Sequence, residues 1–92
     1  MYNIIDGRST GKTGRLMLLA KEHNGIIVCS RPDDMLRKSL GYGIVGITFI
    51  SYDDYLKDTK SYEDTPIFID EVEMFLHHIN KNIKGYTLSN KD

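Results

Sequence analysis

Several features that would mark a specialised class of protein are scarce in this sequence. Among 92 residues there is one cysteine, Cys29, which excludes an internal disulfide and leads us to expect a reducing, cytoplasmic location. The sequence has no apolar run of about 18 residues, so we expect no transmembrane helix and no membrane partner. The first residues lack the basic and then apolar segments that are typical of a secretory signal. No repeat, linker or low-complexity tract divides the chain, and we therefore expect one small domain over residues 1–92.

A strong charge of either sign is also missing. The formal net charge is -1, which excludes a strongly basic nucleic-acid-binding protein; nucleic acid stays open as a partner but is not supported by the charge. The two halves nevertheless differ, since residues 1–50 contain seven Lys or Arg against four Asp or Glu, whereas residues 51–92 contain five against nine. Chance can produce a difference of this size; the alternative is that the first half meets an anion and the second half a cation.

The sequence does contain a regular alternation of short apolar runs and polar stretches. The runs are rich in β-branched and aromatic residues, and three are almost continuously apolar, as expected for strands buried on both faces of a parallel sheet. The five runs are residues 2–5, 26–29, 47–50, 67–69 and 86–88. The stretches between them predict helices over 12–23, 32–40, a few residues after Ser51, and 71–83. This alternation predicts an α/β fold with a mostly parallel sheet of about five strands.

Two of the predicted helices carry more specific signals. Ser51 is followed by Asp54 at the spacing of a capping box, which favours a helix start at this point. The helix over 71–83 has one apolar face, which we expect to pack against the core. That face comprises Val72, Phe75, Leu76, Ile79 and Ile83.

The first predicted strand leads into a glycine-containing loop. Residues 6–13 read Asp-Gly-Arg-Ser-Thr-Gly-Lys-Thr, so that Gly11, Lys12 and Thr13 stand between a predicted strand and a predicted helix. This is the context of a P-loop, in which backbone N–H groups and a helix N-terminus surround a phosphate. In such a loop Lys12 would contact the β- and γ-phosphates, and the Thr13 hydroxyl would bind Mg²⁺. The usual pattern begins with glycine where this chain has Asp6, and a solvent-exposed turn is the alternative interpretation.

A second motif follows later in the chain. Residues 66–71 form an apolar strand that ends in two carboxylates, Asp70 and Glu71, as in a Walker B segment. Asp70 could hold Mg²⁺ opposite Thr13, and Glu71 could act as the general base for an attacking water. Both motifs stand at the carboxyl ends of predicted parallel strands, where open α/β sheets bind ligands. The alternative role for the two carboxylates, compatible with the first, is the acidic start of a helix.

With these two motifs the chain resembles the P-loop NTPases of the ASCE division, and in detail the ATPases of viruses and phages such as the large terminase subunit. The resemblance implies a three-layer P-loop fold that stops after its sensor strand. It implies that Arg8 contacts the γ-phosphate as an arginine finger, with Ser89 or Asn90 as the sensor of that phosphate. It also implies a loop that cradles the nucleotide phosphates. The residues of that loop are Gly7, Arg8, Ser9, Thr10, Gly11, Lys12 and Thr13.

The leading functional hypothesis is therefore Mg²⁺-dependent ATP binding with slow hydrolysis. In this hypothesis Lys12, Glu71 and Arg8 are the catalytic residues, Thr13 and Asp70 hold the metal, and ATP and Mg²⁺ are the ligands. A phage source and a link to DNA processing follow from the resemblance alone. Two alternatives remain: a non-enzymatic P-loop scaffold that binds and regulates a host protein, and a small nucleoside or nucleotide kinase. A protein partner or a homo-oligomer is compatible with each of these.

Other residues have weaker signals. Cys29 is expected to be a small buried hydrophobic residue. Arg31 follows the second strand, where it either contacts phosphate or stands on the surface at a helix start. Adjacent His77 and His78 lack partners at the spacing of a zinc site. A group of tyrosines forms either a partner-binding or base-stacking surface or, as we favour, the half-buried rim of a thin core. These are Tyr42, Tyr52, Tyr55 and Tyr62.

Overall fold

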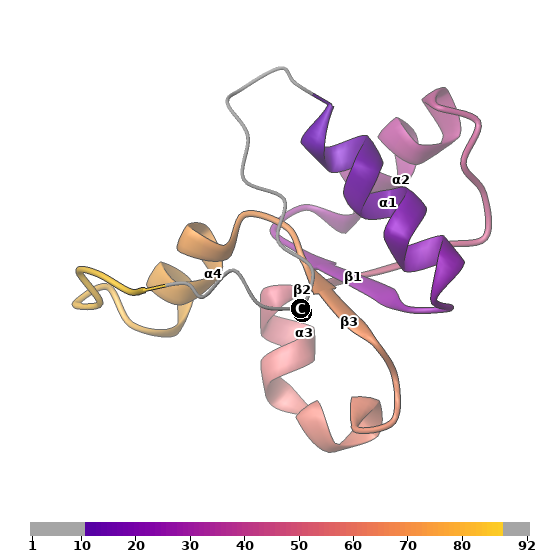
Figure 1. The fold of residues 1–92 in the computed structure, drawn as a ribbon. Helices are drawn as coiled ribbons and strands as arrows, with labels where there is room; N and C mark the ends of the chain where they lie inside the picture. The colour runs from indigo at the N-terminus through magenta and orange to yellow at the C-terminus, as the bar shows by residue number, and fades with distance from the viewer. Residues whose placement is uncertain (1–10, 88–92) are drawn as a thin grey trace.

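A short parallel sheet organises the part of the chain that the structure, a computed structural model, describes, which is residues 11–87 (Figure 1). Its strands are β1 (Ile26–Cys29), β2 (Thr48–Ser51) and β3 (Ile67–Ile69), in the order β2-β1-β3. Both neighbours run parallel to the central strand. Because the three strands are parallel, their carboxyl ends lie at one edge of the sheet.

The prediction of a P-loop sheet of about five strands is wrong for the described residues, which contain three strands in a small α/β fold. The predicted strand at 2–5 lies outside residues 11–87, as does Leu88 of the predicted last strand. Tyr86 and Thr87, the rest of that last run, have no regular secondary structure. The Tyr86 hydroxyl instead donates a hydrogen bond to Glu73 Oε1, at 2.8 Å. This segment therefore contacts the last helix and does not pair with the sheet.

Four α-helices and one short 3-10 helix accompany the strands. They are α1 (Lys12–Glu22), α2 (Pro32–Gly41), α3 (Tyr52–Lys57), η1 (Thr59–Tyr62) and α4 (Val72–Ile79). The cap predicted for α3 is confirmed, because the Ser51 side chain accepts a hydrogen bond from the Asp54 N–H at 3.0 Å. None of the helices within residues 11–87 is long and apolar enough to cross a membrane.

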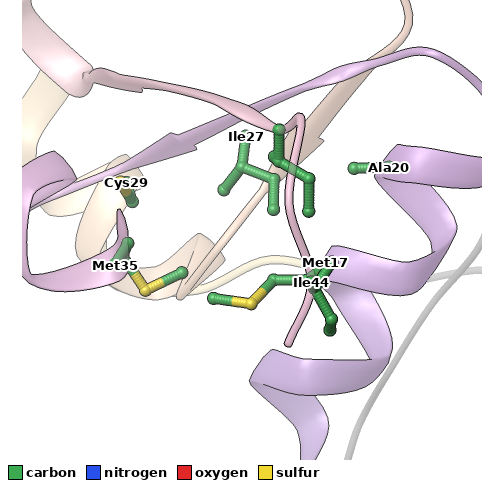
Figure 2. Close-up of a cluster of buried hydrophobic side chains, with 7 residues drawn as sticks. Met17, Ala20, Ile27, Cys29, Met35 and Ile44 are labelled. Carbon is green, nitrogen blue, oxygen red and sulfur yellow. The ribbon is translucent and has the colours of Figure 1, made fainter. Parts of the chain in front are cut away.

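The helices pack on both faces of the sheet, with α1 and α2 on one face and α3 and α4 on the other (Figure 1). Successive side chains of β1 point alternately to the two faces. Ile27 and Cys29 join a cluster with α1, α2 and the loop before β2, which Figure 2 shows. The buried members of this cluster are Met17, Ala20, Ile27, Cys29, Met35, Ile44 and Ile47. The burial expected of Cys29 is confirmed, since 1% of the residue is exposed.

The second cluster, on the opposite face, is smaller. Val28 packs there with Tyr52 of α3 and Phe75 of α4. The rings of Tyr52 and Phe75 meet edge to face, with centroids 5.2 Å apart. Such pairs of aromatic rings add stability beyond the area they bury.

The predicted apolar face of the last helix is largely not in the core. Phe75 is its one buried member, Leu76 and Ile83 are half-buried, and Val72 and Ile79 are exposed. The helix ends at Ile79 and not at 83, because Asn80 adopts an extended conformation. The Asn80 side chain accepts a hydrogen bond from the Asn82 N–H at 2.8 Å, a local turn that competes with helix formation.

Candidate functional site

Two residues from the predicted motifs meet at the carboxyl edge of the sheet. Lys12 begins α1, and Glu71 follows β3 by two residues. The Lys12 Nζ atom lies 3.3 Å from Glu71 Oε1, with side chains 32% and 43% exposed respectively. An ion pair this accessible to water contributes little stability, about 0–1 kcal/mol. The pair can therefore open at small cost when either group acquires another partner.

Gly11 gives α1 an N-terminus without a side-chain cap. Its φ of 79° is in the left-handed region, and its carbonyl accepts the first helical hydrogen bond, from the Arg15 N–H at 3.1 Å. A Cβ atom added to Gly11 would meet no atom within 4 Å, so the space beside it is open. The first turn contains no acidic residue. Since the first N–H groups of a helix have no partner within the helix, this end of α1 suits an anion.

Asp70 lies at the end of β3, with its main chain held to the central strand. Its N–H donates a hydrogen bond to the Val28 carbonyl at 3.0 Å. Burial is the largest effect on the pKa of the Asp70 carboxyl and raises it, and the negative charge of the neighbouring Glu71 raises it further. The positive charges of Lys12 and Lys38 lower this pKa and partly offset the two effects. The carboxylate makes no hydrogen bond or ion pair to any described residue. Carboxyl groups whose pKa is shifted by burial and neighbouring charges are common at functional sites.

Thr13 and Asp70 are the residues predicted to hold Mg²⁺, and this role stays a prediction. Thr13 follows Lys12 in the first turn of α1 and is half-buried. Within residues 11–87 there is no group of three or more His, Cys, Asp or Glu side chains that could enclose a metal ion. Mg²⁺ is often held by one or two carboxylates together with substrate phosphates, and this pattern is compatible with such a sparse ligand set.

Glu71 is the residue at which the chain turns from strand to helix. Its φ of 57° and ψ of 69° are left-handed, although it is not glycine, and it forms the N-cap of α4. Its carbonyl accepts the first hydrogen bond of that helix, from the Phe75 N–H at 3.1 Å. A residue with a Cβ atom in this conformation costs about 1–2 kcal/mol. Strain of this kind persists where the surrounding structure enforces it, and it is common at functional sites.

Tyr52 is the residue of this site that the sequence did not reveal. Its hydroxyl lies 2.7 Å from the Asp70 carbonyl oxygen and 3.3 Å from that of Glu71, and it donates to them. Tyr52 is buried, with 4% exposed; this burial, and then the charge of Asp70, raises its pKa to about 12. The prediction that Tyr52 belongs to a half-buried rim is wrong, because the residue is buried. Its position directly after β2 places it at the same edge as Asp70, and this was the available signal.

The remaining sequence-predicted residues divide into two groups. Five lie outside residues 11–87, so their roles stay predictions: Gly7, Arg8, Ser9, Thr10 and Asn90. Ser89 shares that status. Arg31 stands on the surface beside the start of α2, with its side chain 81% exposed and paired to Asp34 at 3.5 Å. Of the tyrosines, Tyr42 is exposed, while the rings of Tyr55 and Tyr62 pack 5.9 Å apart.

Two pockets of the described surface lie along α4, and neither is lined by Lys12 or Glu71. Comparisons of this chain with protein-family models, with curated proteins and with solved structures found no match. What the site does must therefore be inferred from its residues and their geometry.

Proposed function

We propose that this chain binds a nucleoside triphosphate together with Mg²⁺ and hydrolyses it slowly. The observation that carries the proposal is the 3.3 Å contact between Lys12 and Glu71, which are far apart in the sequence and come from the two predicted motifs. The start of α1 has no side-chain cap, and the Asp70 carboxylate has no hydrogen-bond or ion-pair partner among residues 11–87. With these features, the contact gathers a cation, helix N–H groups and two acids at one edge.

Each residue has a role that follows from its chemistry. Lys12 and the N–H groups at the start of α1 bind the phosphates. Thr13 and Asp70 hold the metal ion, which when bound neutralises charge on the phosphates. Glu71 accepts a proton from water as the water oxygen attacks the terminal phosphate, and the diphosphate leaves. In the same proposal Arg8 contacts the γ-phosphate, and the remaining loop residues contribute backbone N–H groups.

The Lys12–Glu71 pair suggests how binding prepares the base. While the Lys12 ammonium lies against Glu71, one carboxylate oxygen is occupied. A bound phosphate, with a larger negative charge than the carboxylate, draws Lys12 away. Glu71 is then free to accept a proton. The movement of Lys12 from Glu71 to the phosphate thus couples substrate binding to activation of the base.

Titration calorimetry with ATP and Mg²⁺, together with a phosphate-release assay, tests the proposal. Replacing Lys12 by Ala removes charge-assisted hydrogen bonds worth about 1.5–3 kcal/mol, so ATP affinity should fall about tenfold or more. Replacing Glu71 by Gln should leave affinity nearly unchanged and reduce phosphate release by about 10²–10⁴-fold. Lys21→Ala, at the opposite end of the same helix, is the matched control and should behave like the parent.

Two results would overturn the proposal. One is a parent protein without measurable ATP affinity at millimolar concentration. The other is a pair of variants, at Lys12 and Glu71, that both match the parent in affinity and phosphate release. Adding a panel of nucleosides separates hydrolysis from a kinase activity, because a kinase would move the phosphate to the nucleoside and not to water.

A further inference from the structure

A groove beside α4 combines basic and apolar side chains. It is wide and open, and it is formed by α4, the segment that follows it, and residues next to β1 and β2. The groove residues are Tyr52, Met74, His77, His78, Lys81 and Lys84, with Ser30 at one end. None of them belongs to the predicted phosphate loop. The groove is therefore a feature separate from the proposed nucleotide site, although Tyr52 contributes to both.

The charge of this groove is opposite to that of its surroundings. Residues 51–73 contain eight Asp or Glu against two Lys, whereas residues 74–87 contain two Lys, two His and no acid. Lys81 and Lys84 are exposed and make no ion pair with any residue in 11–87. Two acids near these residues already have partners: Asp53 of α3 pairs with His78, and Glu73 of α4 accepts a hydrogen bond from the Tyr86 hydroxyl. With respect to this part of the chain, both lysines therefore remain available to an anionic partner.

Apolar side chains of α4 are exposed in the groove and beside it. Met74, which lines the groove, is 50% exposed, as is Ile79 farther along the helix, and Phe75 is the one buried residue of α4. Apolar side chains grouped with cations in this way are typical of interaction surfaces. Methionine is flexible and polarisable, and it often lines surfaces that accept varied peptide side chains.

We propose that this groove docks an acidic, amphipathic segment of a partner protein. Its Asp and Glu side chains pair with Lys81 and Lys84, and its apolar side chains cover Met74. A nucleic acid is the weaker candidate, because affinity for a polyanion depends on many cations, and here two lysines adjoin a strongly acidic stretch of the chain. The proposal does not depend on nucleotide binding at the other site.

Fluorescence anisotropy with the full-length chain tests this docking. The probe is a short fluorescein-labelled helical peptide with Leu on one face and Glu on the other. We expect saturable binding that weakens about tenfold in the double variant Lys81→Glu/Lys84→Glu. The matched control Lys57→Glu/Lys60→Glu reverses the same number of charges on α3 and η1, outside the groove, and should change affinity less than twofold.

Further probes separate the two contributions. Met74→Ser, and a peptide with Ser in place of Leu, should each weaken binding several-fold because the apolar contact is lost. Circular dichroism melting confirms that each variant is folded. The proposal is overturned if the acidic peptide does not bind the parent, or if the two double variants lose affinity equally. It is also overturned if a labelled oligothymidine binds the groove and the acidic peptide does not.

Discussion

The left-handed backbone of Glu71 gives a prediction that separates strain from side-chain contacts. Replacing Glu71 by Gly and by Gln removes the negative charge, and with it the ion pair to Lys12, in both variants. The two variants then differ mainly in backbone freedom. Gly relieves a left-handed conformation that costs about 1–2 kcal/mol, but the unfolded glycine is more flexible, which costs about 0.5–1 kcal/mol. The Gly variant should therefore be more stable than the Gln variant by about 0.5–1 kcal/mol.

Urea unfolding followed by circular dichroism measures this difference. With a denaturant slope of about 1–3 kcal/mol/M, the midpoint of the Gly variant should lie a few tenths of a molar above that of the Gln variant. Arg37 is the matched control, since it is exposed in the middle of α2 and also pairs with an acid. There the order should reverse, with Gly less stable than Gln by about 0.5–1 kcal/mol.

A Gly variant at 71 that is less stable than the Gln variant, as at position 37, would falsify the strain assigned to Glu71. If the proposed function is correct, both variants at 71 also lose phosphate release. The Gly variant would then be more stable than its Gln counterpart and equally inactive. Such a result would indicate that the chain keeps an unfavourable conformation at this residue because the carboxylate is needed there.

Three further predictions concern residues around the site and the core. The pKa of Asp70 is raised in the folded protein, so its contribution to stability is fully present below the ordinary pKa of 3.8 and is lost as pH rises through the raised value. Asp70→Asn should therefore increase the free energy of unfolding at neutral pH, as measured by urea unfolding, and this gain should disappear in acid. Burial raises the pKa of Cys29 from 9.0 to about 11, so its thiol should resist alkylation in the folded protein. The free energy of unfolding of the parent should also fall between pH 9 and pH 11, and it should fall less steeply in Cys29→Ala. A Cβ atom at Gly25 would lie 2.6 Å from the Phe68 ring and 2.7 Å from the Pro66 carbonyl oxygen, so Gly25→Ala should lower the free energy of unfolding by about 1–3 kcal/mol. The control Gly41→Ala, at a position with open space around it, should not destabilise the protein.

The sequence predicted the local parts of the fold well. The first two helices begin where their signals stand, after Gly11 and at Pro32, and the Ser51 cap is observed. Three apolar runs are the three strands. These features depend on a few neighbouring residues, whose backbone preferences and side-chain hydrogen bonds are visible in the sequence itself.

The number of strands and the burial of α4 could not be predicted in the same way. A run such as Tyr86-Thr87 becomes a strand only if an edge of the sheet is near, and here Tyr86 contacts Glu73 instead. The end of α4 was missed because the turn at Asn80 competes with a helical pattern that continues to Ile83. Both outcomes are decided by competing contacts that periodicity does not rank.

The sequence predicted the charged residues of the candidate site but not the hydrogen bonds that hold its backbone in place. Lys12 and Glu71 follow from two motifs whose order along the chain implies a shared edge, and they meet there. The position of Tyr52 directly after β2 indicated the right edge of the sheet, but its hydrogen bonds to the main chain of Asp70 and Glu71 depend on how α3 packs and could not be predicted. Every residue has a backbone carbonyl, so a hydrogen bond from a side chain to the backbone requires no particular residue type as its partner and cannot be recognised in a single sequence.

The position of β1 has a consequence for how the molecule opens. All four of its residues are buried; Ile27 and Cys29 belong to one hydrophobic cluster and Val28 to the other. The strand pairs with both of its neighbours. Its amide protons can reach solvent only when both layers of helices separate from the sheet. We therefore expect these amides to exchange with deuterium most slowly, at the rate of global unfolding, whereas α4 exchanges through local opening. Asp70 and Glu71 thus stand between β3, which is paired with this slowest-opening strand, and α4, which opens locally.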